Sequence, residues 1–154
     1  MIKINVILNN ISWKKYLRNP NNFIDKKLEL INRKNKLYRK NILICSLLLS
    51  ETNEIKKLNK KFRNKNKSTD VLSFPFYEKK ILNYKISREK EIYLGDIIIN
   101  LNKIKNKDNK LKFKHELNKL WIHGLIHLFG YNHKKNRDFY IMDKIEKKYL
   151  EYIN

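Results

Sequence analysis

The sequence predicts one folded domain that combines β-strands with α-helices. Short segments of alternating or continuous apolar residues, typical of strands, occur along the chain between segments with the apolar spacing of helices. The chain has 154 residues, of which 42% are hydrophobic, and this is enough for one core. No internal repeat and no linker rich in Gly, Pro or Ser divides it.

The first part of the chain predicts a strand, a helix and a second strand. Apolar and polar residues alternate over residues 2–8, as in a half-buried strand. Pro20 and the asparagines beside it start a helix that extends to about Lys36. The apolar run over residues 42–49 is too short for a surface helix and indicates a buried strand.

A helix and an edge strand are expected next. Ile55, Leu58 and Phe62 have the spacing of a helix face that packs on the core. Residues 71–76 are expected to be extended, and Pro75 restricts them to a sheet edge or a strand end.

The second half is expected to contain a charged loop, a strand and three helices. Residues 77–91 have the composition of a loop, and residues 93–99 predict a buried strand with a bulge at its glycine. A helix is expected over about residues 100–107, before the histidine-rich helix. The chain ends in an amphipathic helix over residues 138–153, whose predicted core residues are Ile141, Met142, Ile145, Tyr149, Leu150 and Ile153.

Three of the four histidines lie within eleven residues, with a spacing typical of a metal site. His123 and His127 are four positions apart and therefore share one face of a helix. Gly130 falls where a helix end favours the left-handed conformation, so the chain can turn back and bring His133 to the same point. Three nitrogen ligands leave one tetrahedral position open, as in catalytic zinc sites. Ordinary hydrogen-bonded histidines are the alternative.

Gly124 distinguishes this motif from that of the metzincin peptidases, which have the same histidine spacing. In those enzymes the residue after the first histidine is the glutamate that acts as general base. A peptidase is therefore the least favoured class of enzyme. The helix is otherwise apolar almost all round, and buried imidazoles need partners that a metal would supply. His115, on a lysine-rich stretch two turns upstream, is expected to be exposed.

The formal net charge of +21 indicates a polyanionic partner such as RNA. The chain also lacks alanine and glutamine and is rich in Lys, Asn and Ile, so codon usage in an A+T-rich genome is an alternative source of the charge. Lys60, Lys61, Lys65 and Lys67 form a basic run that is expected either to contact RNA phosphates or to be a solvated helix end.

Cys45 is the only cysteine, which excludes an intrachain disulfide, and it is expected to be a small buried hydrophobe. No apolar run is long enough to span a bilayer, and the first residues lack the order of a signal peptide. A cytoplasmic protein without a membrane partner is therefore expected.

Three segments together resemble the YbeY family of bacterial metal-dependent endoribonucleases. In chain order they are 62–76, which contains Thr69-Asp-Val-Leu-Ser-Phe-Pro-Phe76, then Leu94-Gly-Asp-Ile-Ile-Ile99, and the histidine motif 123–133. The histidine motif alone leaves peptidases open, whereas the combination is highly specific. The surrounding pattern of elements agrees with the family from about residue 40 to 150.

The resemblance implies an α+β, zincin-like fold with a small mixed β-sheet and a metal site on the penultimate helix and the following turn. One zinc ion would be held by His123, His127 and His133. The implied function is cleavage of single-stranded RNA during 3′-end maturation of small-subunit rRNA and in ribosome quality control. The implied partners are rRNA, the small ribosomal subunit and ribosome-associated proteins, with no small-molecule organic cofactor. A non-catalytic, zinc-stabilised ribosome assembly factor is the alternative.

Three further residues are expected to support this site. Arg63 matches the functional arginine of the family, and a guanidinium suits the oxygens of a phosphoryl transition state; a surface arginine that ends a basic helix is the alternative. Asn132 and Asp96 are candidates to orient the metal ligands. The family typically has Asp where this chain has Asn132, so weaker support and lower activity are expected.

Overall fold

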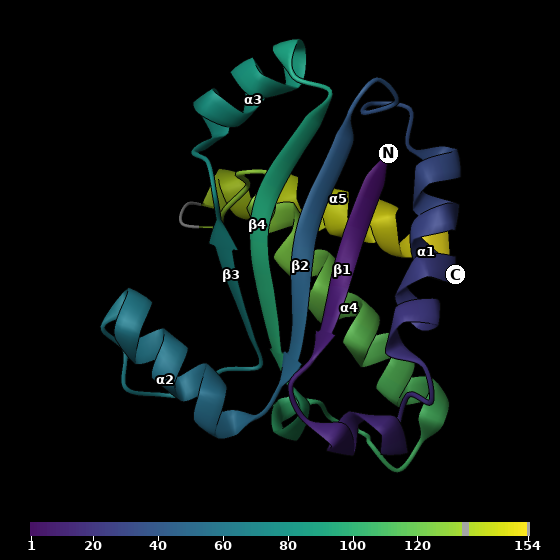
Figure 1. The fold of residues 1–154 in the computed structure, drawn as a ribbon, viewed down its shortest axis with the longest axis vertical. Helices are drawn as coiled ribbons and strands as arrows, with labels where there is room; N and C mark the ends of the chain where they lie inside the picture. The colour runs from purple at the N-terminus through teal and green to yellow at the C-terminus, as the bar shows by residue number, and fades with distance from the viewer. Residues whose placement is uncertain (134–135, 154) are drawn as a thin grey trace.

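A computed structural model describes residues 1–133 and 136–153, which form one mixed β-sheet with helices around it (Figure 1). The strands lie in the order β1-β2-β4-β3. Their bounds are β1 (Ile2–Leu8), β2 (Ile42–Ser50), β3 (Val71–Pro75) and β4 (Glu91–Asn100). β1, β2 and β4 are parallel, whereas β3 pairs antiparallel with β4 at the edge. The predicted α+β fold with a small mixed sheet is confirmed.

Two long helices cross one face of the sheet, as Figure 1 shows in green and yellow. The α-helices are α1 (Pro20–Lys34), α2 (Thr52–Arg63), α3 (Lys79–Arg88), α4 (Lys110–Leu128) and α5 (Asn136–Ile153), and two short 3-10 helices are η1 (Ile11–Lys15) and η2 (Leu101–Lys103). α4 contacts β3, β4 and α5, while α1 contacts β1 and α5. α4 is therefore the element that links the core to the edge of the sheet.

The main core lies between the sheet and these helices. Every second residue of β2 from Leu43 to Leu49 is buried, which confirms the predicted buried strand. Trp121 of α4 and Trp13 of η1 are both 0% exposed. A smaller cluster on the other face joins Ile55 of α2 to the sheet.

The bulge predicted at the glycine of β4 is present. Ile44 pairs with Tyr93 but Cys45 pairs with Gly95, so Leu94 is the extra residue. Burial raises the pKa of the Cys45 thiol to about 12, as expected for an inert buried cysteine.

Two predictions of secondary structure were wrong. Residues 77–91 are not a loop, because most of them form α3, which one buried side chain, Leu82, attaches to the core. The helix expected over about residues 100–107 is reduced to η2, because the backbone is already extended at Ile104 and left-handed at Asn106.

Two residues predicted to face the core lie on the surface instead. Phe62 is 59% exposed because it lies in the last turn of α2, beyond the small cluster, and packs only edge-on against Phe74. Ile141 of α5 is 43% exposed, whereas Met142 beside it is buried. Among the described residues, no helix is both long and apolar enough to cross a bilayer.

Candidate metal centre and the adjoining cleft

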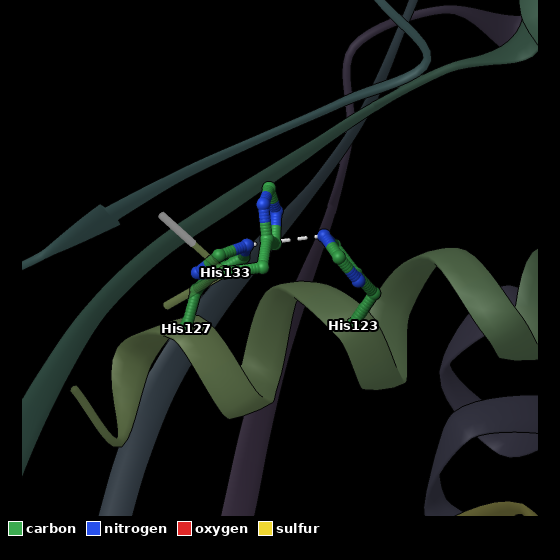
Figure 2. Close-up of side chains that lie close together, drawn as sticks. All are labelled: His123, His127 and His133. Carbon is green, nitrogen blue, oxygen red and sulfur yellow. Dashed lines mark hydrogen bonds between the residues drawn. The ribbon is translucent and has the colours of Figure 1, made fainter. Parts of the chain in front are cut away.

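Three imidazoles converge at the C-terminal end of α4 (Figure 2). His123 and His127 extend from successive turns of the helix, and the Nε2 atoms of the two rings are 3.0 Å apart. His133 returns to them from the segment after the helix, so that one nitrogen of each ring lies within 4.8 Å of the others. The spacing of the motif therefore brings these three side chains together as expected.

Each helical imidazole has an acceptor beside its other nitrogen. Glu146 of α5 accepts from His123 Nδ1 at 2.6 Å, and the carbonyl oxygen of Tyr131 accepts from His127 Nδ1 at 2.9 Å. Because both partners are acceptors, both neutral rings carry their proton on Nδ1 and keep the Nε2 lone pair free.

This donor set suits a cation. Two Nε2 lone pairs that face each other at 3.0 Å repel unless a positive charge lies between them. Tetrahedral zinc with bonds of about 2.0–2.1 Å requires ligand nitrogens roughly 3.3 Å apart, close to the observed separation. The same hydrogen bonds to Nδ1 are common behind metal-binding histidines.

His127 is kept neutral by its surroundings. Burial, and then the neighbouring His123, lower the pKa of His127 from its ordinary value of 6.5 to about 4. Metal binding requires neutral imidazole, so the ring is available as a ligand well below neutral pH.

Two glycines determine how α4 carries these side chains. Gly130 has φ +80°, and its N–H donates to the His127 carbonyl, so the chain turns as predicted. A Cβ on Gly124 would lie 2.6 Å from Cγ2 of Ile97 in β4. Position 124 corresponds to the general base of metzincins, and here it packs directly against the sheet. A glutamate side chain would not fit there, which argues against a peptidase.

A cleft of about 790 Å³ adjoins the three histidines. One side of it, the histidine wall, contains His127 and His133. Another part of the lining, the edge wall, contains Arg63 from the end of α2 and Phe76 after β3. Within 1–133 and 136–153, the residues that line the cleft are Arg63, Ser73, Pro75, Phe76, Tyr77, Glu78, Lys79, His127, Gly130, Tyr131, Asn132 and His133.

The family model described as "Endoribonuclease YbeY" matches residues 7–154 of this chain. The chain belongs to the YbeY family. It is 44% identical to the endoribonuclease YbeY of Pelagibacter ubique, with 99% of this chain and 97% of that protein covered. It is 34% identical to the endoribonuclease YbeY of Ehrlichia canis over 98% of this chain and 92% of that protein.

A solved structure has the same fold. The solution structure of TM1509 from Thermotoga maritima matches with a TM-score of 0.59 and 27% sequence identity, over 98% of this chain and 89% of that one. The segments through which the sequence resembles the YbeY family thus occur within a chain that matches the family over nearly its whole length.

Arg63, the candidate catalytic residue from the sequence, lies in the edge wall. Its Nη2 donates to the backbone oxygen of Ser73 at 2.9 Å, and its guanidinium lies 5.6 Å from the centre of the Phe74 ring. These contacts hold the end of α2 against β3. A guanidinium has five N–H donors, so one bond to Ser73 leaves others for a ligand in the cleft.

The other predicted site residues are spread more widely. Asn132 is exposed and lines the cleft next to His133. All four lysines of the basic run are exposed. Two of them, Lys60 and Lys61, line a separate depression of about 530 Å³ at the end of α2.

Asp96 is placed differently from the prediction. Its carboxylate accepts a hydrogen bond from the Tyr93 hydroxyl at 2.6 Å. Asp96 precedes Ile97, whose side chain contacts α4, and alternate residues of a strand point to opposite faces. Asp96 therefore points away from the histidine helix, and the carboxylate that contacts a histidine is that of Glu146.

Three residues of this region were not predicted from the sequence. Glu146 was not predicted because it lies 23 residues after His123, on another helix. Phe76 and Lys79 line the cleft, but they were assigned to the end of a strand and to a loop. The regular spacing of α5, which places Glu146 one residue after the core residue Ile145, was the only local signal for Glu146.

Proposed function

We propose that this chain is a zinc-dependent endoribonuclease that cleaves single-stranded RNA in the cytoplasm. The proposed biological role is 3′-end maturation of small-subunit rRNA and ribosome quality control, in contact with the small ribosomal subunit. The observation that carries the proposal is the convergence of three imidazoles beside a cleft that also contains an arginine. Membership of the YbeY family supports RNA as the substrate.

His123, His127 and His133 would hold the ion. When bound, zinc would supply Lewis acidity toward a phosphoryl oxygen. Glu146 and the Tyr131 carbonyl keep the His123 and His127 rings in the tautomer and orientation that binding requires.

Arg63 is proposed to act on the substrate from the edge wall. Phosphodiester hydrolysis increases the negative charge on the phosphoryl oxygens in the transition state, and a guanidinium can donate two parallel hydrogen bonds to them. The bond to Ser73 fixes the position of the arginine before the substrate arrives, so its orientation costs little at the moment of reaction.

The test combines metal content with cleavage. Purified protein is expected to contain about one zinc per chain, measured by mass spectrometry of the metal, and to cleave a single-stranded precursor of the small-subunit rRNA 3′ end. His127→Ala should lose both properties. His115→Ala is the matched control, because His115 lies on the same helix but is exposed. Cleavage that persists in His127→Ala would indicate a contaminating nuclease and favour the assembly-factor alternative.

A further inference from the structure

Phe76, in the edge wall of the cleft, is a large aromatic side chain that the proposed reaction does not use. Phe76 is 62% exposed, although its backbone N–H is fixed by a hydrogen bond to the Leu94 carbonyl at 2.9 Å. Two neighbouring rings pack against it in T-shaped arrangements, with ring centres at 4.9 Å for Tyr77 and 5.7 Å for Tyr93. The ring is thus held in place and still open to solvent.

Two cations line the same cleft as this ring. Arg63 and Lys79 line the same cleft, against one carboxylate, that of Glu78. The Lys79 Nζ lies 3.9 Å from the centre of the Tyr131 ring, which also lines the cleft. An exposed aromatic ring in one cleft with two cations suits a ligand with flat rings joined by phosphates.

We propose that Phe76 is a stacking platform for an unpaired nucleobase, with Arg63 and Lys79 beside it to contact the flanking phosphates. The proposal rests on the proposed function, since it concerns how the same cleft selects its RNA. Bases in single strands expose their faces to aromatic side chains, whereas bases within a duplex are already stacked. A stacking platform at this position selects single-stranded RNA without selecting a sequence.

The chain offers a direct fluorescence test. Trp13 and Trp121 are both 0% exposed, so Phe76→Trp introduces the only exposed indole among the described residues. The full-length variant is titrated with a 2′-O-methyl RNA single strand, with a duplex of the same sequence, and with an abasic oligomer of equal length and charge. Gel analysis verifies that the strands stay intact. We expect the single strand to quench the indole strongly and the other two to have little effect.

Affinity measurements on the natural background complete the test. Phe76→Ala and Phe76→Leu should weaken binding of the single strand about ten-fold, while Phe76→Tyr should bind as the unchanged protein does. Phe76→Leu keeps an apolar side chain but removes the flat ring, so it separates stacking from general hydrophobic contact. Tyr84→Ala is the matched control, since Tyr84 is 59% exposed on α3 and lies outside the cleft.

Two results would overturn the proposal. One is equal quenching by the base-bearing single strand and by either the abasic oligomer or the duplex. The other is unchanged affinity in both Phe76→Ala and Phe76→Leu. Binding is measured here without cleavage, so the two proposals can fail separately. If the single strand quenches the indole but the protein does not cleave RNA, the proposed enzymatic function is contradicted and the stacking platform is not.

Discussion

The two walls of the cleft are built in different ways. The histidine wall lies at the C-terminal end of α4, where every residue over 121–128 except His123 and His127 is buried, and each of these two helical imidazoles has an acceptor behind it. The edge wall consists of exposed side chains at the ends of α2 and β3, and one hydrogen bond to Ser73 holds its arginine. The imidazoles, which must keep the geometry of a metal site, are held by the helix and by hydrogen bonds. The side chains proposed to contact RNA lie at the exposed edge of the sheet. Variants of the two walls should therefore differ in what they change.

The largest effect is expected from removing the charge of the edge wall. Arg63→Ala should lower single-stranded RNA cleavage about 100-fold, as for loss of one preorganised transition-state donor. Arg63→Lys should recover only part of this loss, because an ammonium cannot donate two parallel hydrogen bonds. Cleavage rates and zinc content of both variants provide the measurement.

Zinc content should stay unchanged in both arginine variants. This result would show that the edge wall affects cleavage without affecting metal binding. Loss of the bonds to Ser73 and Phe74 should reduce the free energy of unfolding by only about 1 kcal/mol, checked by thermal melting. Wild-type cleavage in both variants would contradict a role for Arg63 in the reaction.

A smaller effect, on zinc affinity rather than on cleavage, is expected from Glu146, which lies behind His123. Glu146→Gln should weaken zinc binding about ten-fold, since a neutral amide is a poorer acceptor for His123 Nδ1. Competition with a chromophoric chelator measures the affinity. Glu151→Gln, exposed on the same helix, is the control. Equal zinc affinity in all three proteins would mean that Glu146 does not support the ligand.

The half-buried imidazole of His127 also predicts a pH dependence of stability for the metal-free protein. The pKa of His127 is lowered from 6.5 to about 4 in the folded chain, so the unfolded chain binds a proton first as the pH falls. Folding stability should therefore decrease between about pH 6.5 and pH 4, and this contribution should not decrease further below that range.

Thermal melting of chelator-treated protein across this pH range tests the assignment. His127→Gln should show a smaller decrease in melting temperature than the unchanged protein, because its side chain does not titrate. The exposed His115→Gln should keep the wild-type pH profile. Identical profiles for His127→Gln and the unchanged protein would assign the acid sensitivity to other groups.

The smallest effect is expected from the basic run, whose lysines would contact RNA phosphates if the RNA continues from the edge wall past the end of α2. Changing Lys65 and Lys67 to Ala should reduce the slope of log affinity against log salt by about one to two units, one for each lost phosphate contact. Changing Lys147 and Lys148 on α5 should alter this slope much less. Equal changes for both pairs would indicate a diffuse positive field, as codon bias would produce.

The local parts of this molecule could be predicted from the sequence, and the parts that depend on packing between elements could not. The meeting of His123, His127 and His133 follows from one helical spacing and one left-handed glycine, both of which are local. Glu146 joins them only because α5 packs on α4. Residues 79–88 have too many charges for a clear helical face, yet the burial of Leu82 is enough to attach α3 to the core. The local sequence does not show which element each of these residues contacts.

Gly124 has a consequence for how such sites can evolve. It sets the distance between α4 and β4, and any side chain there must displace Ile97 or the helix itself. A single substitution therefore cannot exchange the base of a peptidase for the close contact seen in this chain. A glutamate at this position would also require a change at Ile97. The two kinds of protein thus share the histidine spacing but differ in how closely the helix packs on the sheet.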